Sequence, residues 1–429
     1  MKELELYIHI PFCERKCAYC DFLSFPSDHI EREHYVKQLI REINSYSQTF
    51  LEYEVRSLFI GGGTPSLLKA EEVLAIMIKC REIFVIRDDA EITIECNPGS
   101  VTQEKAQMWA QAGINRVSIG LQSTSNDELQ MLGRIHTYEE FLTTYHLLRS
   151  LGFNNINVDL ISGIPGQTLA SYEANVIKVC NLDPKPEHIS AYSLIIEEGT
   201  VFGERYLDIE ECKETQKHDL LRPMNHNDLK YISLPDEETD QLMYERTAEI
   251  LAQYGYHRYE ISNYSLDGYE CIHNKGYWER VEYLGLGLGA SSQIGNYRFS
   301  QTEHVSSYLN QNNVAQVLHD IKKEDNKQTE DNIQTGACSP IGLTKLQQKV
   351  ETLSTEEEIE ECVMLGLRLM DGISDSSCIA RYGVSLIERY YKPLFKLQKE
   401  GLITLEQDTI RLTAKGIRVS NYVIAEILY

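Results

Sequence analysis

Short β-type runs alternate with helix-period segments along the first 195 residues, and this alternation restricts the fold more than any other feature. Strands that alternate with helices favour repeated βαβ units and a parallel sheet. Right-handed crossovers would curl roughly six such units into an open barrel, although periodicity alone leaves a flat, doubly wound sheet as the second reading. The predicted strands are Leu4–Ile10, Arg56–Ile60, Glu91–Glu95, Arg116–Gly120, Asn155–Ile161 and His188–Leu194.

The chain divides into four parts by composition. Residues 1–195 form the predicted barrel core, 196–320 a barrel extension whose first fifty residues look polar and irregular, 321–353 a polar linker or insertion, and 354–429 a C-terminal domain. Ser354 before an acidic run is typical of a helix N-terminus. The segment GLITLEQDTIRLTAKG predicts a hairpin after helices, an order that resembles a winged helix. We therefore expect an α/β protein: an incomplete parallel β/α barrel with a small helical or winged C-terminal domain.

Charge and hydropathy exclude several classes of protein. Forty-one basic and 65 acidic residues give a net charge of −24, which repels phosphate backbones and argues against a nucleic-acid partner. Even the winged segment 351–429 has thirteen acidic and nine basic side chains. No apolar run approaches about 18 residues, and the N-terminus lacks the pattern of a signal peptide. We expect a cytoplasmic protein without a transmembrane segment, a location compatible with peripheral contact at a membrane.

Three of the eleven cysteines are clustered, in the order Cys13-Glu-Arg-Lys-Cys17-Ala-Tyr-Cys20 directly after the first predicted strand. Three thiolates on one loop can ligate three irons of a [4Fe–4S] cubane and leave the fourth iron free for a small molecule. A structural zinc site normally needs four ligands, and this loop holds no fourth cysteine or histidine. We favour the cluster, while a zinc site completed from a distant segment stays the alternative.

Polar or glycine-rich loops follow the other predicted strands. Gly61-Gly62-Gly63-Thr64-Pro65 follows the second strand, Glu95 ends the third, Gln122 follows the fourth and Asp159 lies in the fifth. Glycine backbone allows the close approach of a ligand, although a tight turn explains the same run. Because active sites of α/β barrels assemble at the carboxyl ends of the strands, these positions predict one site.

The cysteine spacing is the signature of the radical S-adenosylmethionine (SAM) superfamily, which this chain resembles. The resemblance implies that SAM binds the open iron, and that one electron from the cluster cleaves it to methionine and a 5′-deoxyadenosyl radical. It also implies an electron donor. The pieces YIHIPFC, GGGTPS, ECNPG, SIGLQS, LGRIH, DLISGIPGQT and EISNY resemble the branch that contains oxygen-independent coproporphyrinogen oxidases. By this resemblance, the SAM contacts are Tyr7, Tyr19, Gly62, Gly63, Thr64, Glu95, Gln122, Arg134 and Asp159.

Two readings compete within that branch. Coproporphyrinogen oxidases typically carry a fourth cysteine two residues after the third and a longer N-terminal extension. Here Asp21-Phe22 follows Cys20, and twelve residues precede Cys13. Both departures favour the sister group of heme chaperones, which deliver heme to acceptor apo-proteins, respiratory ones among them. The oxidase, which would use the radical on coproporphyrinogen III, stays the alternative, so the sequence does not decide whether the chain is an enzyme.

A histidine beside two aromatic residues agrees with the chaperone reading. His273-Asn274-Lys275-Gly276-Tyr277-Trp278 resembles the H-N-x-x-Y-W motif of that group. A histidine can bind heme iron, and aromatic rings pack well against a porphyrin. The plain alternative is a buried, hydrogen-bonded histidine in the core. We predict His273 as a heme contact, which makes heme the third expected cofactor beside the [4Fe–4S] cluster and SAM.

Overall fold

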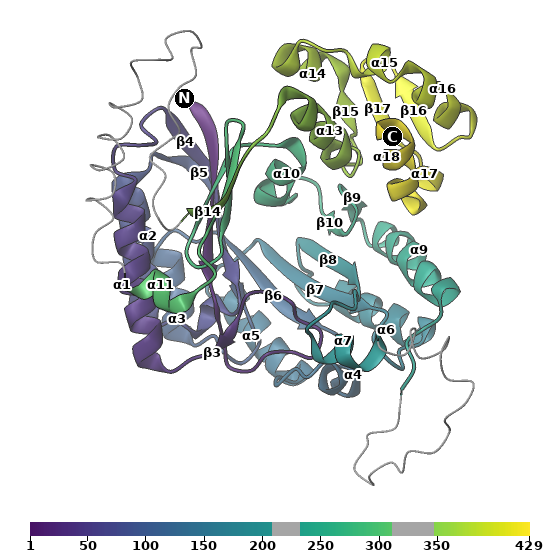
Figure 1. The fold of residues 1–429 in the computed structure, drawn as a ribbon. Coiled ribbons are helices and arrows are strands. Elements are labelled where there is room, and N and C mark those ends of the chain that lie inside the picture. The colour runs from purple at the N-terminus through teal and green to yellow at the C-terminus, as the bar shows by residue number, and fades with distance from the viewer. Residues whose placement is uncertain (208–231, 311–346) are drawn as a thin grey trace, which may run out of the picture.

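The computed structural model describes residues 1–207, 232–310 and 347–429, and one large sheet runs through it (Figure 1). Its strands lie in the order β14-β13-β12-β11-β1-β4-β5-β6-β7-β8-β10-β9. All pairs from β11 to β8 are parallel, and the pairs at both ends are antiparallel. The parallel strands are β1 Lys2–Ile10, β4 Tyr53–Gly62, β5 Ile86–Cys96, β6 Arg116–Gln122, β7 Ile156–Ser162, β8 His188–Ser193 and β11 Tyr283–Leu286.

The six predicted strands are therefore confirmed. The incomplete barrel is confirmed too, because the sheet formed by the described residues does not close on itself. The seventh parallel strand, β11, comes from the glycine-rich stretch YLGLGLGA and pairs with β1 at the open side. The flanking antiparallel strands were not predicted from the sequence. They are β9 His257–Arg258, β10 Asn263–Ser265, β12 Ser291–Ile294, β13 Tyr297–Gln301 and β14 Gln347–Thr352.

Helices connect the parallel strands and cover the sheet (Figure 1). In α1 the buried side chains Tyr35, Val36, Leu39 and Ile43 recur at helical spacing. Asp28 caps α1 through a capping box with Glu31. The helices of this part are α1 His29–Ser45, η1 Pro65–Leu67, α2 Ala70–Ile83, α3 Gln103–Gln111, α4 Asn126–Met131, α5 Tyr138–Ser150, α6 Leu169–Cys180, α7 Val201–Tyr206, α9 Glu237–Gln253, α10 Ile272–Glu279 and α11 Val305–Leu309.

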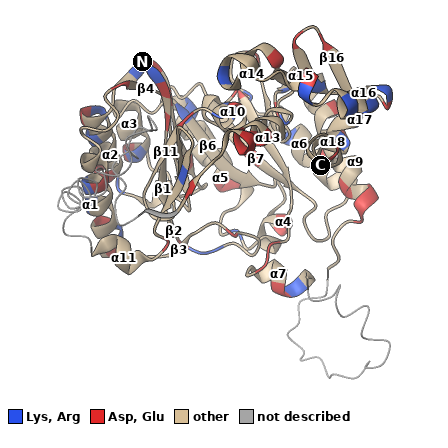
Figure 2. Cartoon of the chain, turned by 45° about the horizontal axis from the view of Figure 1, so that its top comes forward, with Lys and Arg blue, Asp and Glu red and all other residues tan. Residues whose placement is uncertain are grey.

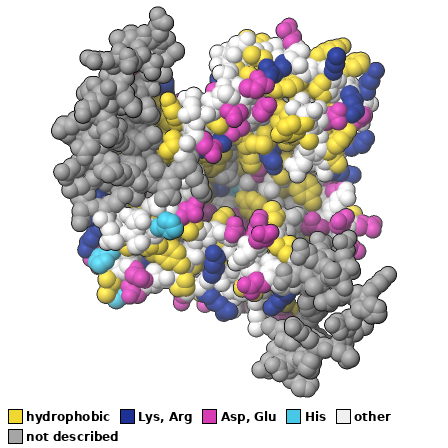
Figure 3. Space-filling model, in the orientation of Figure 1, with side chains coloured by type: hydrophobic (Ala, Val, Ile, Leu, Met, Phe, Trp, Pro, Cys, Tyr) yellow, Lys and Arg dark blue, Asp and Glu magenta, His cyan; other side chains and the backbone are white. Residues whose placement is uncertain are grey.

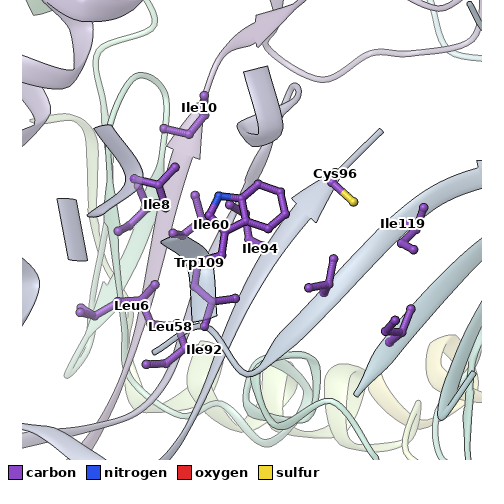
Figure 4. Close-up of a cluster of buried hydrophobic side chains, with 14 of the residues drawn as sticks. Leu6, Ile8, Ile10, Leu58, Ile60, Ile92, Ile94, Cys96, Trp109 and Ile119 are labelled. Carbon is purple, nitrogen blue, oxygen red and sulfur yellow. The ribbon is translucent and has the colours of Figure 1, made fainter. Parts of the chain in front are cut away.

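The main core lies between the sheet and these helices (Figure 4). Figure 4 shows Trp109 of α3, which is fully buried, against isoleucines and leucines of β1, β4 and β5. Six of the seven residues of β6 are buried, which is typical of a parallel strand with both faces covered. This packing fixes the ends of the strands, where the predicted site residues lie.

The region read as irregular contains regular structure, and that reading was wrong for its described part. Helix α9 begins at Glu237 and buries Met243, Thr247, Ile250 and Leu251 against the barrel. Residues 208–231 and 311–346, which include most of the predicted linker 321–353, lie outside the described residues. In the described part of the chain, no helix combines the length and apolar character needed to cross a bilayer.

A second hydrophobic cluster lies in residues 359–427. Ser354 caps α13 through a capping box with Glu357, as the sequence predicted. The hairpin of β16 and β17 is also confirmed, and β15 completes a three-stranded sheet, so the unit has a winged form. Its elements are α13 Thr355–Gly366, β15 Ile373–Ser374, α14 Asp375–Tyr382, α15 Leu386–Arg389, α16 Tyr391–Lys399, β16 Ile403–Glu406, β17 Thr409–Leu412, α17 Ala414–Arg418 and α18 Ser420–Leu428.

A buried carboxylate in α1 gives the fold a pH-dependent weakness. Glu42 accepts hydrogen bonds from the Tyr308 hydroxyl (2.6 Å) and the Gly287 amide (3.0 Å), yet burial raises its pKa to about 7. A raised pKa means that the folded state binds more protons than the unfolded state between the ordinary value and pH 7, so stability falls as pH rises through that window.

We expect Glu42→Gln to remove this pH dependence while it keeps an oxygen acceptor for Tyr308 and Gly287. As the pH rises from 5 to 8, the free energy of unfolding of the variant should increase by about 1–3 kcal/mol relative to that of the wild type. The reason is that the neutral amide, unlike the buried carboxyl, does not ionise. Urea denaturation at both pH values measures the gain. Glu104→Gln, on the exposed side of α3, serves as the control and should change little. An equal effect of both substitutions would contradict the assignment.

Candidate functional site

The three clustered cysteines lie on the loop that leaves β1. Cys13 ends the short strand β2 Phe12–Cys13, which pairs with β3 Phe25–Pro26 and so closes the loop at its base. His9 in β1 contacts the Leu23 carbonyl through Nε2 at 2.9 Å, and the Ala18 amide donates to the Leu132 carbonyl at 3.0 Å. The first contact holds the base of the loop and the second holds its middle, while the three cysteines stay partly exposed.

Two polar side chains from elsewhere in the barrel reach the cysteine sulfurs. Thr64 Oγ1 lies 3.6 Å from Cys13 Sγ, and Arg134 Nη1 lies 3.6 Å from Cys17 Sγ. Arg134 also donates to Asn97 Oδ1 and to the Gly120 carbonyl, both at 2.7 Å. The predicted contacts Thr64 and Arg134 are therefore placed beside the cluster loop.

The donor set suits a cubane better than a single ion. In the described ranges, no three His, Cys, Asp or Glu side chains are arranged to hold one metal ion. In a [4Fe–4S] cluster each thiolate binds a different iron, so its three sulfurs need not converge on one point. Free, partly exposed thiols on one loop fit that requirement.

Two buried carboxylates, Glu95 and Asp159, lie close enough inside the barrel for their charges to interact. Burial, and next the charge of Asp159, raises the pKa of Glu95 to about 8. Burial also raises the pKa of Asp159, against the hydrogen bond that Asn157 donates at 2.7 Å. Such groups ionise more readily when a cation lies next to them. The charges of Arg116 and Arg134 offset this burial only in part, since the pKa of each carboxyl stays raised. The pair therefore forms an acidic centre inside the barrel that suits a positively charged ligand.

The glycine turn is required by the protein itself. Gly62 has φ +113°, and a Cβ there would lie 2.5 Å from the His9 ring. A Cβ on Gly63 would lie 2.6 Å from the Phe12 carbonyl oxygen. The Gly62 amide donates to Glu95 Oε2 at 3.0 Å, so the turn also holds this carboxylate. Close packing against the cysteine loop is thus sufficient to explain both glycines. A ligand contact through their backbone would be an additional role.

Most of the remaining predicted residues line one cavity of about 540 Å³. Figure 3 shows one face of the molecule, on which a hollow lies below the C-terminal unit with hydrophobic side chains around it. A neighbouring cavity of about 480 Å³ is lined by Cys17, Thr64 and Arg134. The predicted residues in the larger cavity are Tyr7, Tyr19, Glu95, Gln122, Asp159 and His273, together with Cys20.

His273 lies in the wall of this cavity but is only 2% exposed. Its Nδ1 contacts Ser57 Oγ at 2.9 Å and its Nε2 contacts the Tyr277 hydroxyl at 3.0 Å. Burial, and next the charge of Arg116, lowers the pKa of His273 to about 3. The ring is therefore neutral and has both nitrogens engaged. Whether it contacts heme stays a prediction, and iron ligation would require the Tyr277 bond to open.

The sequence reading missed Arg116, Asn97 and Asn157. Arg116 is 2% exposed, lines the larger cavity and has its nearest carboxylate oxygen, in Glu91, at 3.9 Å. Its signal in the sequence was an arginine at the start of an otherwise apolar strand. Asn97 stands two residues after Glu95 in ECNPG, and Asn157 two residues before Asp159. In β7 this spacing places Asn157 and Asp159 on one face of the strand, whereas Asn97 lies one residue beyond the end of β5.

Family models match two parts of the chain. The model of the Radical SAM superfamily matches residues 7–176, and that of the HemN C-terminal domain matches residues 353–419. The first implies a [4Fe–4S] cluster and SAM as cofactors. The coproporphyrinogen III oxidase HemN of Escherichia coli, a radical SAM enzyme, has a structure similar to 99% of this chain and 90% of its own, with a TM-score of 0.75. At 21% identity this likeness shows a shared fold.

Curated relatives match nearly the whole chain. The protein of Lactococcus lactis named heme chaperone HemW is 32% identical, over 98% of this chain and 96% of its own. That of Bacillus subtilis is also 32% identical, over 98% of both, and that of Escherichia coli is 34% identical over 75% of this chain and 79% of its own. On the strength of these matches, the chain belongs to the HemW family of radical SAM proteins.

Proposed function

We propose that this chain is a cytoplasmic heme chaperone, which binds heme and transfers it to acceptor apo-proteins. The observation that carries the proposal is the similarity to proteins named heme chaperone HemW over 98% of the chain. The residues after the cysteine triplet support it, since Asp21-Phe22 leaves no fourth cysteine in the loop. Respiratory proteins are one class of acceptor, and a separate reductant would supply electrons to the cluster.

Cys13, Cys17 and Cys20 would hold the [4Fe–4S] cluster, and SAM would lie between the two cavities. When bound, the pair supplies reductive cleavage of a sulfonium, chemistry that belongs to the cofactors. Glu95 and Asp159 balance the positive charge of SAM, and Arg134 orients its carboxylate. The other contacts we propose are Tyr7, Tyr19, Gly62, Gly63, Thr64 and Gln122.

SAM affinity should depend on the ionisation of Glu95. With a pKa of about 8, this carboxyl is mostly protonated at pH 6.5 and mostly ionised at pH 9. A cationic ligand prefers the ionised form, so we expect affinity to rise by up to about tenfold per pH unit below pH 8. Isothermal titration of the reconstituted protein with SAM measures this slope. In Glu95→Gln the slope should disappear and binding should weaken; an unchanged slope would remove Glu95 from the SAM site.

His273 is the residue we propose to contact heme. Its ring stacks on Phe59, with centroids 5.2 Å apart and planes at 24°, and Tyr7 lies on the same aromatic wall. Nε2 of His273 contacts the Tyr277 hydroxyl along α10. This nitrogen would give up that hydrogen bond in order to bind the heme iron. Helix α10 would then place the iron at the cavity wall.

A pair of variants tests this contact. His273→Ala should shift the Soret band and weaken heme binding, while the iron–sulfur absorption stays. Tyr277→Phe removes the hydroxyl that competes for Nε2 and should bind heme at least as tightly as the wild type. If His273→Ala binds heme with an unchanged spectrum, the histidine is a core residue and no ligand.

The function itself is tested on a single anaerobic preparation. The reconstituted protein is titrated with heme, mixed with an apo-protein whose spectrum changes on heme uptake, and assayed in parallel with coproporphyrinogen, SAM and reductant. We expect heme transfer and no decarboxylated porphyrinogen. Decarboxylation without heme transfer would establish the oxidase, the alternative that the sequence left open.

A further inference from the structure

Two cysteines of the C-terminal unit lie side by side. Cys362 on α13 and Cys378 on α14 have their sulfur atoms 3.5 Å apart. Cys378 is 3% exposed and belongs to the second hydrophobic cluster, whereas Cys362 is partly exposed. A disulfide bond is about 2.0 Å long, so modest side-chain rotation would join the two sulfurs.

The same two helices hold the end of α10, the helix that carries His273. Arg280 follows α10 in the left-handed backbone conformation and is 3% exposed. Its guanidinium donates to the Glu358 carbonyl of α13 (3.0 Å) and to the Tyr382 hydroxyl of α14 (2.7 Å). Arg381 of α14 donates in return to the carbonyl of Arg280 at 3.0 Å. Figure 2 shows acidic residues of α13, coloured red, beside α10. One acidic residue of α13, Glu361, pairs with Arg280 at 3.1 Å.

The two thiols differ in reactivity. The hydrogen bond from Cys378, and then the charges of Arg280 and Arg381, lower the pKa of Cys362. The same hydrogen bond and burial raise the pKa of Cys378. By contrast, burial raises the pKa of Cys80, Cys96, Cys180 and Cys271, which makes these thiols poor nucleophiles. Cys362 is thus the more reactive and the more accessible member of the pair.

We propose that Cys362 and Cys378 form a reversible disulfide that joins α13 to α14 and stiffens their hold on α10. The oxidant is a small disulfide such as oxidised glutathione. The Cys362 thiolate attacks it, a new sulfur–sulfur bond forms, and one thiolate of the oxidant leaves. Cys378 loses its proton and attacks Cys362, which releases the second small thiol. Two protein thiols are oxidised and one small disulfide is reduced to two thiols. The proposal does not depend on heme binding.

Peptide mapping tests the disulfide directly. Trypsin cuts the chain so that Cys362 lies in peptide 350–368 and Cys378 in peptide 369–381. The anaerobically reconstituted protein is treated with oxidised glutathione, its free thiols are alkylated, and the digest is analysed without reductant. We expect the two peptides to be linked and to separate after reduction. In Cys378→Ser, glutathione should remain on the peptide 350–368. If that variant is glutathionylated while the wild type yields both peptides alkylated, the disulfide does not form and the proposal fails.

Amide hydrogen exchange tests the link to α10. Oxidation of the wild type should slow exchange in residues 272–280 several-fold, and it should leave Cys362→Ser unchanged. The iron–sulfur absorption, recorded on the same samples, shows that the cluster cysteines are untouched. Equal exchange in the oxidised and reduced wild type would overturn the coupling between the pair and α10.

Discussion

The Cys17→Ala variant is expected to lose its iron–sulfur absorption and most of its iron while it keeps the fold. Three thiolates are the minimum that holds three corners of a cubane, and the loop carries no spare cysteine. Cys17 is partly exposed and lies outside the main hydrophobic core, so its loss leaves the core packing intact. Iron analysis and visible absorption after anaerobic reconstitution measure the effect, and circular dichroism reports the fold.

A buried cysteine provides the matched control for this variant. Cys180 ends α6 and is 3% exposed inside the main core. Cys180→Ala should lower the thermal midpoint, because it leaves a small cavity, and it should bind a full complement of iron. The two variants thus separate loss of metal from loss of stability. The cluster assignment would not survive a Cys17→Ala protein with wild-type iron content.

Much of the fold follows from local signals in the sequence. The parallel strands β1, β4, β5, β6, β7 and β8 each carry several apolar residues within a short segment, and their order along the chain is also their order in the sheet. Helices α1 and α2 are long enough for their buried faces to repeat several times. Helix α9 had the same signal, since Met243, Thr247 and Ile250 recur at helical spacing, but polar neighbours concealed it. Helix α10 has eight residues and contains a glycine, so its periodicity is too short to read.

The sequence predicts where in the fold the candidate site lies. It predicts much less of the contacts that the site residues make. Strand ends that lie at one edge of a parallel sheet bring Glu95, Gln122 and Asp159 to one cavity, and that much follows from topology. The approach of Arg134 to Cys17 joins residues 117 positions apart, and only the folded chain determines it. Burial likewise sets the pKa of Glu95, and the sequence alone does not show how deeply that carboxyl is enclosed.

Gly276 also depends on a long-range contact, in this case with Glu5 of β1. This glycine lies in α10 between His273 and Tyr277, and it packs against β1. A Cβ at position 276 would lie 2.0 Å from Glu5 Oε1. Glu5 is fully buried, its pKa is raised to about 8 by burial against the influence of Arg56, and Arg56 Nε holds it at 2.9 Å. The carboxylate therefore has little room to move away.

We expect Gly276→Ala to destabilise the protein, although alanine normally stabilises a helix interior by about 1 kcal/mol relative to glycine. Overpacking against a fixed side chain costs about 1–3 kcal/mol, so the sign of the helix-propensity effect is reversed. The same displacement would move His273 away from Ser57 and weaken heme binding. Urea denaturation at constant pH measures the stability, and heme titration measures the second effect.

The double variant Glu5→Ala/Gly276→Ala identifies the cause. Glu5→Ala removes the carboxylate that blocks a Cβ at position 276, so the cost of Gly276→Ala should shrink or vanish in its presence. A thermodynamic cycle should show a coupling energy of about 0.5–3 kcal/mol between the two positions. Strictly additive effects would mean that Gly276 matters for a reason other than Glu5. A coupled pair would show that β1 sets the position of the helix that carries His273.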